Sequence, residues 1–151
     1  MSLRYKPYKR FHLHNDTVAA IAFSPDATLI ASGGLDGRLG IWSSKTGKLI
    51  HLVNGSSGVI SLTWSSQKQI RCGLRSGVVV TVEIRSVCNV TSPRILIFLF
   101  SMLVKADICA TGFQAHSHPV ECMAFEKNIL VTGAYNELRV WNLVNDSRFA
   151  G

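Results

Sequence analysis

Short segments that favour β-strands follow one another along the first third of the chain. They lie at residues 18–23, 29–31, 39–42 and 49–53. The first has period-two alternation, and Pro25 follows it at a position suited to the first corner of a tight turn. Gly33-Gly34 and Asp36-Gly37 separate the second and third segments, and Asp-Gly is typical of hairpins. The pattern predicts four short antiparallel strands in residues 13–54.

The same pattern returns twice further along the chain. Val59–Trp64 matches the first segment 41 residues later, and Val120–Phe125 repeats it once more. Repetition at a period of this length is the sequence signature of a repeat architecture. The chain therefore divides into three units, which we place at residues 13–54, 55–84 and 115–146.

Four polar or aromatic residues of the first unit resemble the WD-repeat of β-propellers. They are His14, Ser32, Asp36 and Trp42. The resemblance implies an all-β fold of four-stranded antiparallel blades, about three of them, in an incomplete ring. It also implies that the four residues are a structural hydrogen-bonded set, because a buried indole N–H, an imidazole and a carboxylate must satisfy one another.

The resemblance weakens in the later units. The third unit carries His116, Thr132 and Trp141, with Asn136 in place of the aspartate. The second unit is degenerate, and the residues at its four positions are Gly55, Cys72, Ser76 and Val82. The expected structural set therefore covers the first and third units only.

Two segments fall outside the repeats. Residues 85–114 lie where the spacing between the second and third units is about 20 residues longer than that between the first and second. Their centre, Ile95–Val104, is apolar without period-two contrast. We interpret them as an insertion or, alternatively, as a short intron read in frame, in a truncated or mis-spliced product without stable function. Residues 1–12 form a basic N-terminal segment, with the outer strand of a preceding blade as the alternative interpretation.

Length limits how far a ring can close. At roughly 40 to 45 residues per blade, 151 residues supply about three and a half blades, whereas propellers have about four to eight. We expect an open arc, a fragment of a longer product, or self-association that completes the propeller.

Composition excludes a disordered chain, because 47% of the residues are hydrophobic and only 17% are charged. The longest apolar run is ten residues, which is too short to span a bilayer. A net charge of +7 favours acidic partners. An alternative function is therefore a nucleic-acid or anionic-surface binding module that uses the N-terminal segment with Lys68, Arg71 and Arg75, although we rank nucleic acid below proteins.

No reaction centre or cofactor motif stands out. The four cysteines lack CxxC spacing, and His116 and His118 have no third ligand, so we expect neither a metal nor another cofactor. Nucleophile elbows, phosphate loops and HExxH are absent from the sequence, and we expect no enzymatic activity. The N-terminal residues do not resemble a secretory signal, which favours an intracellular protein, cytoplasmic or nuclear.

The resemblance implies a scaffold that binds other proteins through its loops. Candidate partner-binding residues, placed by repeat position, are Asn15, Asp16, Leu35, Ser57, Arg75, His118 and Tyr135. Tyr135 and Arg75 are the stronger candidates, because tyrosine and arginine are favoured at interface hot spots. The partner's identity does not follow from the sequence.

Overall fold

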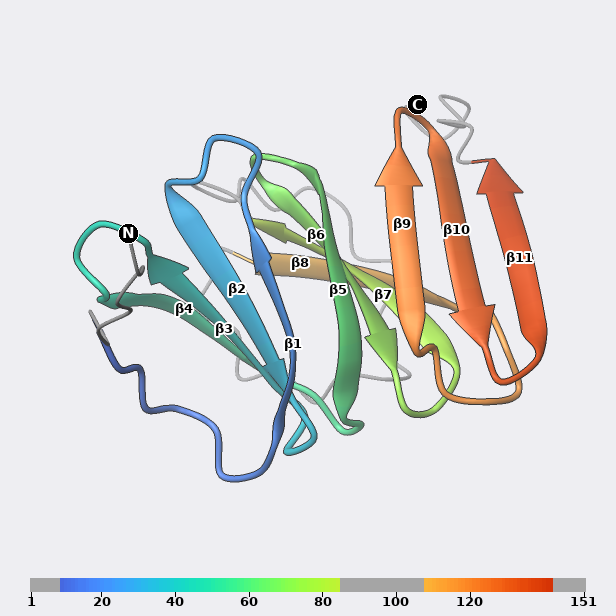
Figure 1. The fold of residues 1–151 in the computed structure, drawn as a ribbon, viewed down its shortest axis with the longest axis horizontal. Coiled ribbons are helices and arrows are strands. Elements are labelled where there is room, and N and C mark those ends of the chain that lie inside the picture. Colours follow the sequence, from blue (N-terminus) through green and yellow to red (C-terminus); the bar gives the residue numbers. More distant parts are fainter. Residues whose placement is uncertain (1–8, 85–107, 143–151) are drawn as a thin grey trace, which may run out of the picture.

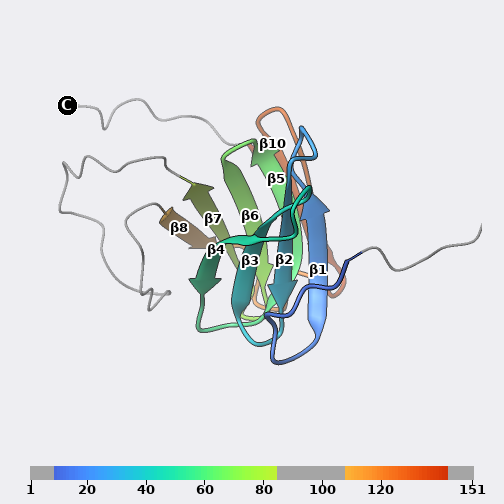
Figure 2. The ribbon, with the colours of Figure 1, turned by 90° about the vertical axis from the view of Figure 1, so that its left-hand side faces the viewer.

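The computed structural model describes residues 9–84 and 108–142. These residues form three antiparallel sheets and no helix, which confirms the all-β prediction. The sheets follow one another along the long axis of the molecule (Figure 1), and the view from the first sheet places it in front of the others (Figure 2). The described residues do not close a ring.

The first sheet has the strand order β1-β2-β3-β4. Its strands are β1 (Val18–Phe23), β2 (Leu29–Gly34), β3 (Arg38–Ser43) and β4 (Leu49–Asn54). They coincide closely with the four predicted segments. Gly37 forms the turn between β2 and β3 with a φ of 78°, and an added Cβ there would lie 2.6 Å from the carbonyl oxygen of Gly55. Glycine at position 37 is therefore required by both the turn and the loop packed against it.

The second sheet has the order β5-β6-β7-β8. Its strands are β5 (Val59–Ser66), β6 (Gln69–Leu74), β7 (Val78–Ile84) and β8 (Ile108–Gln114). The prediction that residues 85–114 are all an interruption is thus wrong for 108–114, which pair with β7 along its whole length. The strand was missed because it follows the long apolar run and lacks clear period-two contrast. The rest of that segment, residues 85–107, lies outside the described residues.

The third sheet has the order β11-β10-β9. Its strands are β9 (Cys122–Glu126), β10 (Ile129–Ala134) and β11 (Glu137–Asn142). The end of the third predicted unit, residues 143–146, is outside the described part of the chain, as are residues 1–8. Residues 9–12 carry no strand, so the outer-strand interpretation of residues 1–12 does not hold for the part that the structure describes.

The core lies between the sheets. Leu39 and Ile41 of the first sheet pack with Val59, Trp64 and further apolar residues of the second. A second cluster joins the second and third sheets around Val79, Val120 and Leu130, all of them buried. The first strands β1, β5 and β9 are neighbours from sheet to sheet. Each sheet therefore needs its neighbour to bury one face, as expected for a repeat protein.

Hydrogen bonds link neighbouring sheets in addition to the apolar clusters. The Trp64 indole Nε1 donates to the carbonyl oxygen of Ala22 at 3.2 Å, from the second sheet to the first. The Ser61 hydroxyl donates to the carbonyl oxygen of Val120 at 2.7 Å, from the second sheet to the third. These polar contacts fix how one first strand lies against the next.

Candidate functional site

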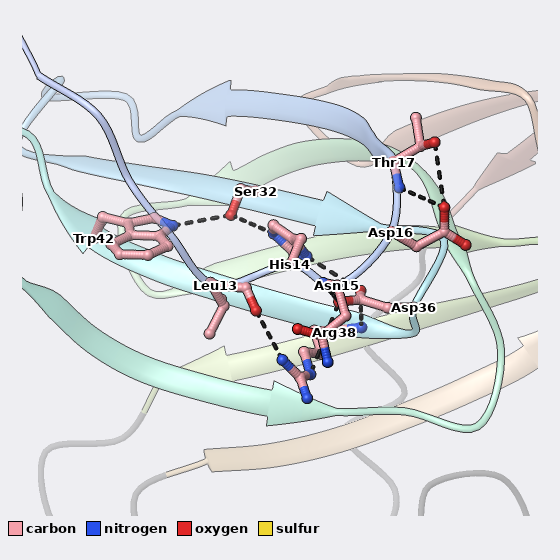
Figure 3. A network of polar contacts seen from close by, with 9 residues as sticks. All are labelled: Leu13, His14, Asn15, Asp16, Thr17, Ser32, Asp36, Arg38 and Trp42. Atoms are coloured by element: carbon pink, nitrogen blue, oxygen red, sulfur yellow. Dashed lines mark hydrogen bonds and ion pairs between the residues drawn. The ribbon is translucent and has the colours of Figure 1, made fainter.

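Four side chains of the first sheet form a continuous chain of hydrogen bonds (Figure 3). The Trp42 indole Nε1 donates to Ser32 Oγ at 2.9 Å, and Ser32 Oγ lies 2.9 Å from His14 Nε2. His14 Nδ1 lies 3.1 Å from Asp36 Oδ1. Because the carboxylate only accepts, it assigns the imidazole proton to Nδ1 and leaves Nε2 to accept from the serine hydroxyl. We call this chain of bonds the first relay; every group in it has a partner.

Asp36 also holds the loop that precedes β1. Its carboxylate accepts the backbone N–H groups of Asn15 at 2.8 Å and Arg38 at 3.0 Å. Burial opposes ionisation of Asp36, but these donors and His14 outweigh it and hold the pKa of the carboxyl below its ordinary value. Arg38 in turn donates to the carbonyl oxygen of Leu13 at 2.7 Å. The loop and the β2–β3 hairpin are thereby joined as one unit.

The third sheet repeats the arrangement with one exchange, forming a second relay. The Trp141 indole donates to Thr132 Oγ1 at 2.9 Å, and that oxygen lies 2.7 Å from His116 Nε2. His116 Nδ1 contacts Glu137 Oε2 at 2.9 Å. The expected position of the acid, Asn136, is therefore wrong, because Glu137 contributes the carboxylate. Hydrogen bonds from His116 and Arg139 lower the pKa of this carboxyl.

Hairpin length explains the exchange. In the first sheet Gly33 pairs with Leu39, whereas in the third Gly133 pairs with Leu138, so the turn is one residue shorter. The acidic residue then falls at the start of the strand instead of in the turn. Glutamate is one methylene longer than aspartate and reaches the same imidazole nitrogen.

The second sheet has no relay, and buried apolar side chains occupy two of the four equivalent positions. Cys72 and Val82, which occupy the serine and tryptophan positions, are buried in the core cluster shared with the first sheet. Gly55 and Ser76 supply no imidazole or carboxylate. Burial raises the pKa of the Cys72 thiol to about 12, so it is a packing group and not a nucleophile at neutral pH.

Two aromatic pairs cover the relays and were not predicted. Phe11 lies on Trp42 with the ring centroids 5.0 Å apart, and Phe113 lies on Trp141 at 4.9 Å. Each phenylalanine comes three residues before the histidine of its relay. This shared spacing in the sequence could have identified both residues.

The loops at one end of the sheets form a continuous edge, which we call the loop edge. It comprises residues 13–17, 35–37, 55–58, 75–77, 115–121 and 135–136, and it lies along the bottom of Figure 1. Backbone N–H groups bond from one loop segment to the next along it. Three pairs join loop segments: Leu35 to Thr17, Gly55 to Gly37 and Arg75 to Gly58; a fourth joins Val120 to Leu74, the last residue of β6. The loop edge is therefore pre-organised by main-chain bonds and by both relays.

All the candidate partner-binding residues are in or beside the loop edge. Tyr135 is 78% exposed, and its ring stacks on that of exposed His118 with the centroids 5.4 Å apart. Arg75 is exposed in the β6–β7 turn, and Asn15 and Asp16 are exposed before β1. Leu35 and Ser57 are half-buried, so they present less surface than the others.

Tyr135 also has an unusual backbone conformation. Its φ of 51° lies in the left-handed region, which large side chains seldom occupy and which costs about 1 kcal/mol or more. A glycine or asparagine would relieve the strain at this exposed turn. Ala27 and Lys127 have similar φ angles of 58° and 54° in other turns, so this conformation alone does not distinguish Tyr135.

The three cations of the anion-binding alternative do not form one patch. Lys68 is in the β5–β6 turn and Arg75 is in the β6–β7 turn, at opposite ends of β6, roughly 20 Å apart along the strand. Arg71 lies between them but is buried, with its guanidinium 4.7 Å from the centroid of the Phe125 ring. The structure therefore does not bring these charges to a common surface.

The relay hydroxyls do not resemble a nucleophile in an active site. Ser32 and Thr132 are buried, and each bonds both an indole and an imidazole. Among the described residues, no group of three or more histidine, cysteine or acidic side chains is placed to hold a metal ion. In the same part of the chain, no helix is long and apolar enough to cross a membrane.

Comparison with known proteins agrees with this geometry. The family described as "WD domain, G-beta repeat" matches residues 5–43, which include the whole first relay. The chain is 37% identical over 59 residues to small ribosomal subunit protein RACK1y of Oryza sativa subsp. japonica, covering 39% of this chain and 18% of that protein. It is 27% identical over 143 residues to cell division cycle 20.6, cofactor of APC complex, of Arabidopsis thaliana, covering 91% of this chain and 29% of that protein.

The fold is similar to that of a solved structure of U3-55K. The TM-score is 0.67 at 20% identity, and the similarity covers 88% of this chain and 38% of the other. The chain thus spans less than a third of the length of the two curated relatives. Since the relays, the stacked sheets and the comparisons agree, the chain is a WD40-repeat protein built from β-propeller blades.

Proposed function

We propose that this protein is a non-catalytic, intracellular scaffold that binds other proteins through the loop edge, with Tyr135, His118 and Arg75 as its main contacts. WD40 proteins are in general protein-interaction scaffolds. The observation that carries the assignment is the exposed Tyr135–His118 stack on a loop edge fixed by main-chain bonds. A rigid aromatic residue loses little conformational entropy on binding, which favours it as an interface anchor.

The relatives support the class of partner. One is named as a ribosomal subunit protein and another as a cofactor of the APC complex, so both names refer to proteins of large assemblies. By analogy, we propose that the present chain contacts a protein within an assembly.

The test compares proteins retained by the tagged chain in cells. We expect Tyr135→Asn and Arg75→Ser to lose a common set of partners at least tenfold, because asparagine tolerates the backbone conformation of Tyr135. Lys68→Ser is the matched control, since Lys68 is exposed at the opposite edge. Equal retention by all three variants would contradict the assignment to the loop edge.

A second arm separates protein binding from anion binding. The partners are captured again after nuclease treatment and at two salt concentrations. Loss of retention under either treatment would favour phosphate contacts, which weaken steeply as salt rises. Retention through both treatments supports contacts with protein.

A further inference from the structure

The first and third sheets each have one apolar face without a neighbouring sheet among the described residues. The leading face is on the first sheet and consists of Val18, Ile21 and Phe23. The trailing face is on the third sheet and consists of Cys122, Ala124, Gly133, Leu138 and Val140. Both ends of the molecule carry large exposed apolar side chains. One charged residue, Glu126 at the end of β9, shares the trailing side with Cys122 and Ala124 by strand alternation. Exposed apolar patches of this kind mark interaction surfaces.

The trailing face is equivalent to a surface that is buried elsewhere in the molecule. By strand register, Leu138 and Val140 correspond to Leu39 and Ile41 of the first sheet. Leu39 and Ile41 are 2% and 0% exposed beneath the second sheet, whereas Leu138 and Val140 are 69% and 63% exposed. The trailing face therefore has the shape and chemistry of a surface that receives another sheet.

The leading face is likewise equivalent to a buried surface, namely the face of the second sheet that packs against the first sheet. Ile21 and Phe23 correspond to Leu62 and Trp64 of the second sheet, which pack in the core cluster against the first sheet. Ile21 is 72% and Phe23 is 61% exposed, but Trp64 is only 8% exposed. The leading face thus presents the side chains that cover a trailing face inside the molecule.

A glycine and a valine meet where the first sheet packs on the second and where the second packs on the third, which we call the internal junctions. An added Cβ at Gly33 would lie 2.4 Å from Val59 Cγ1, and one at Gly73 would lie 2.8 Å from Val120 Cγ1. The equivalent glycine of the trailing face is Gly133. Among the described residues, the only atom within 4 Å of its added Cβ is Cys122 Sγ.

We propose that a second copy of this chain packs its leading face onto the trailing face of the first, with Val18 of one copy on Gly133 of the other. The contact joins two different surfaces, so it repeats from copy to copy and closes only in a ring. Three sheets from each of two copies give six, which is within the range of about four to eight blades seen in propellers. The expected assembly is a two-copy ring.

The test uses the full chain and measures its mass in solution under reducing conditions. The wild type is expected at twice the chain mass of 16.6 kDa. Ile21→Glu blocks the leading face and Val140→Glu blocks the trailing face, so each variant alone is expected at 16.6 kDa. Mixed together they retain one intact junction and should form a 1:1 dimer. Asn128→Glu, in the exposed β9–β10 turn, is the matched control and should behave as the wild type.

A cross-link tests the register independently of charge. Ser61 bonds the backbone of Val120 at the internal junction, and Cys122 occupies the position of Ser61 on the trailing face. Val18→Cys should therefore form a disulfide with Cys122 of the other copy on oxidation, identified by peptide mapping. A wild-type monomer at all concentrations, single variants that still assemble, or no cross-link between these two positions would overturn the proposal.

Discussion

Removing the Ser32 hydroxyl tests the first relay most sharply. Ser32→Ala deletes the group that accepts from Trp42 Nε1 and bonds His14 Nε2, each at 2.9 Å. The indole N–H stays buried without a partner, which costs about 1–3 kcal/mol, and the lost bond to His14 costs about 1 kcal/mol net. We therefore expect the free energy of unfolding to fall by about 2–4 kcal/mol, a large share of the 5–15 kcal/mol typical of a domain.

Urea denaturation followed by far-UV circular dichroism measures this change. Ser76→Ala is the matched control, because Ser76 is exposed in the degenerate second unit, at the position equivalent to Asp36, and should change stability by less than about 0.5 kcal/mol. In the Ser32→Ala background, Trp42→Phe should cost at least about 1 kcal/mol less than in the wild type, because the unpaired donor is already present. A loss below about 0.5 kcal/mol for Ser32→Ala, or simple additivity in the double variant, would refute the reasoning.

Three further outcomes follow from the described contacts. The N–H of Thr28, then the hydroxyl of Ser24, lower the pKa of Asp26 from 3.8 to about 2, so its contribution to stability is present above about pH 4 and lost as the pH falls toward 2. Asp26→Asn should flatten the acid side of the stability profile measured by urea midpoints, and an unchanged slope would contradict this. Glu137→Ala should lower the urea midpoint more than Asn136→Ala does, because of the two only Glu137 bonds His116; the reverse order would show that Asn136, and not Glu137, completes the second relay. In the Ile21→Glu variant, whose trailing face stays uncovered, exposed Cys122 should react with a thiol reagent in the native protein while Cys72 reacts only on unfolding, and equally fast labelling would show that Cys72 is not buried.

Much of the fold could be predicted because local signals agree with the final structure. Period-two segments and the Asp36-Gly37 turn mark the first sheet almost residue by residue. By contrast, β8 follows a long apolar run in which no alternation separates strand from surroundings, so its 108–114 segment was assigned to the interruption. Its pairing with β7 is a non-local property that local patterning does not reveal.

The candidate site was predictable in kind and less so in detail. Repeat spacing places histidine, hydroxyl and tryptophan in both relays, since those residues lie at fixed points in paired strands. It cannot place the acid of the third sheet, because one residue less in the hairpin moves the carboxylate from Asn136 to Glu137. Burial of Arg71 between sheets also depends on three-dimensional packing, which a count of basic residues does not contain.

Hydrogen exchange of the backbone amides along the loop edge tests the central claim most directly. The stacked sheets present a fixed set of loops. The N–H groups of Leu35, Gly55 and Arg75 donate to carbonyl oxygens of the loop edge, and that of Val120 donates to Leu74 at the end of β6. These four amides should exchange far more slowly than those of an unfolded chain, in step with the central strands β6 and β7. Exchange of the four amides at unfolded rates while the strands stay protected would contradict a pre-organised binding edge.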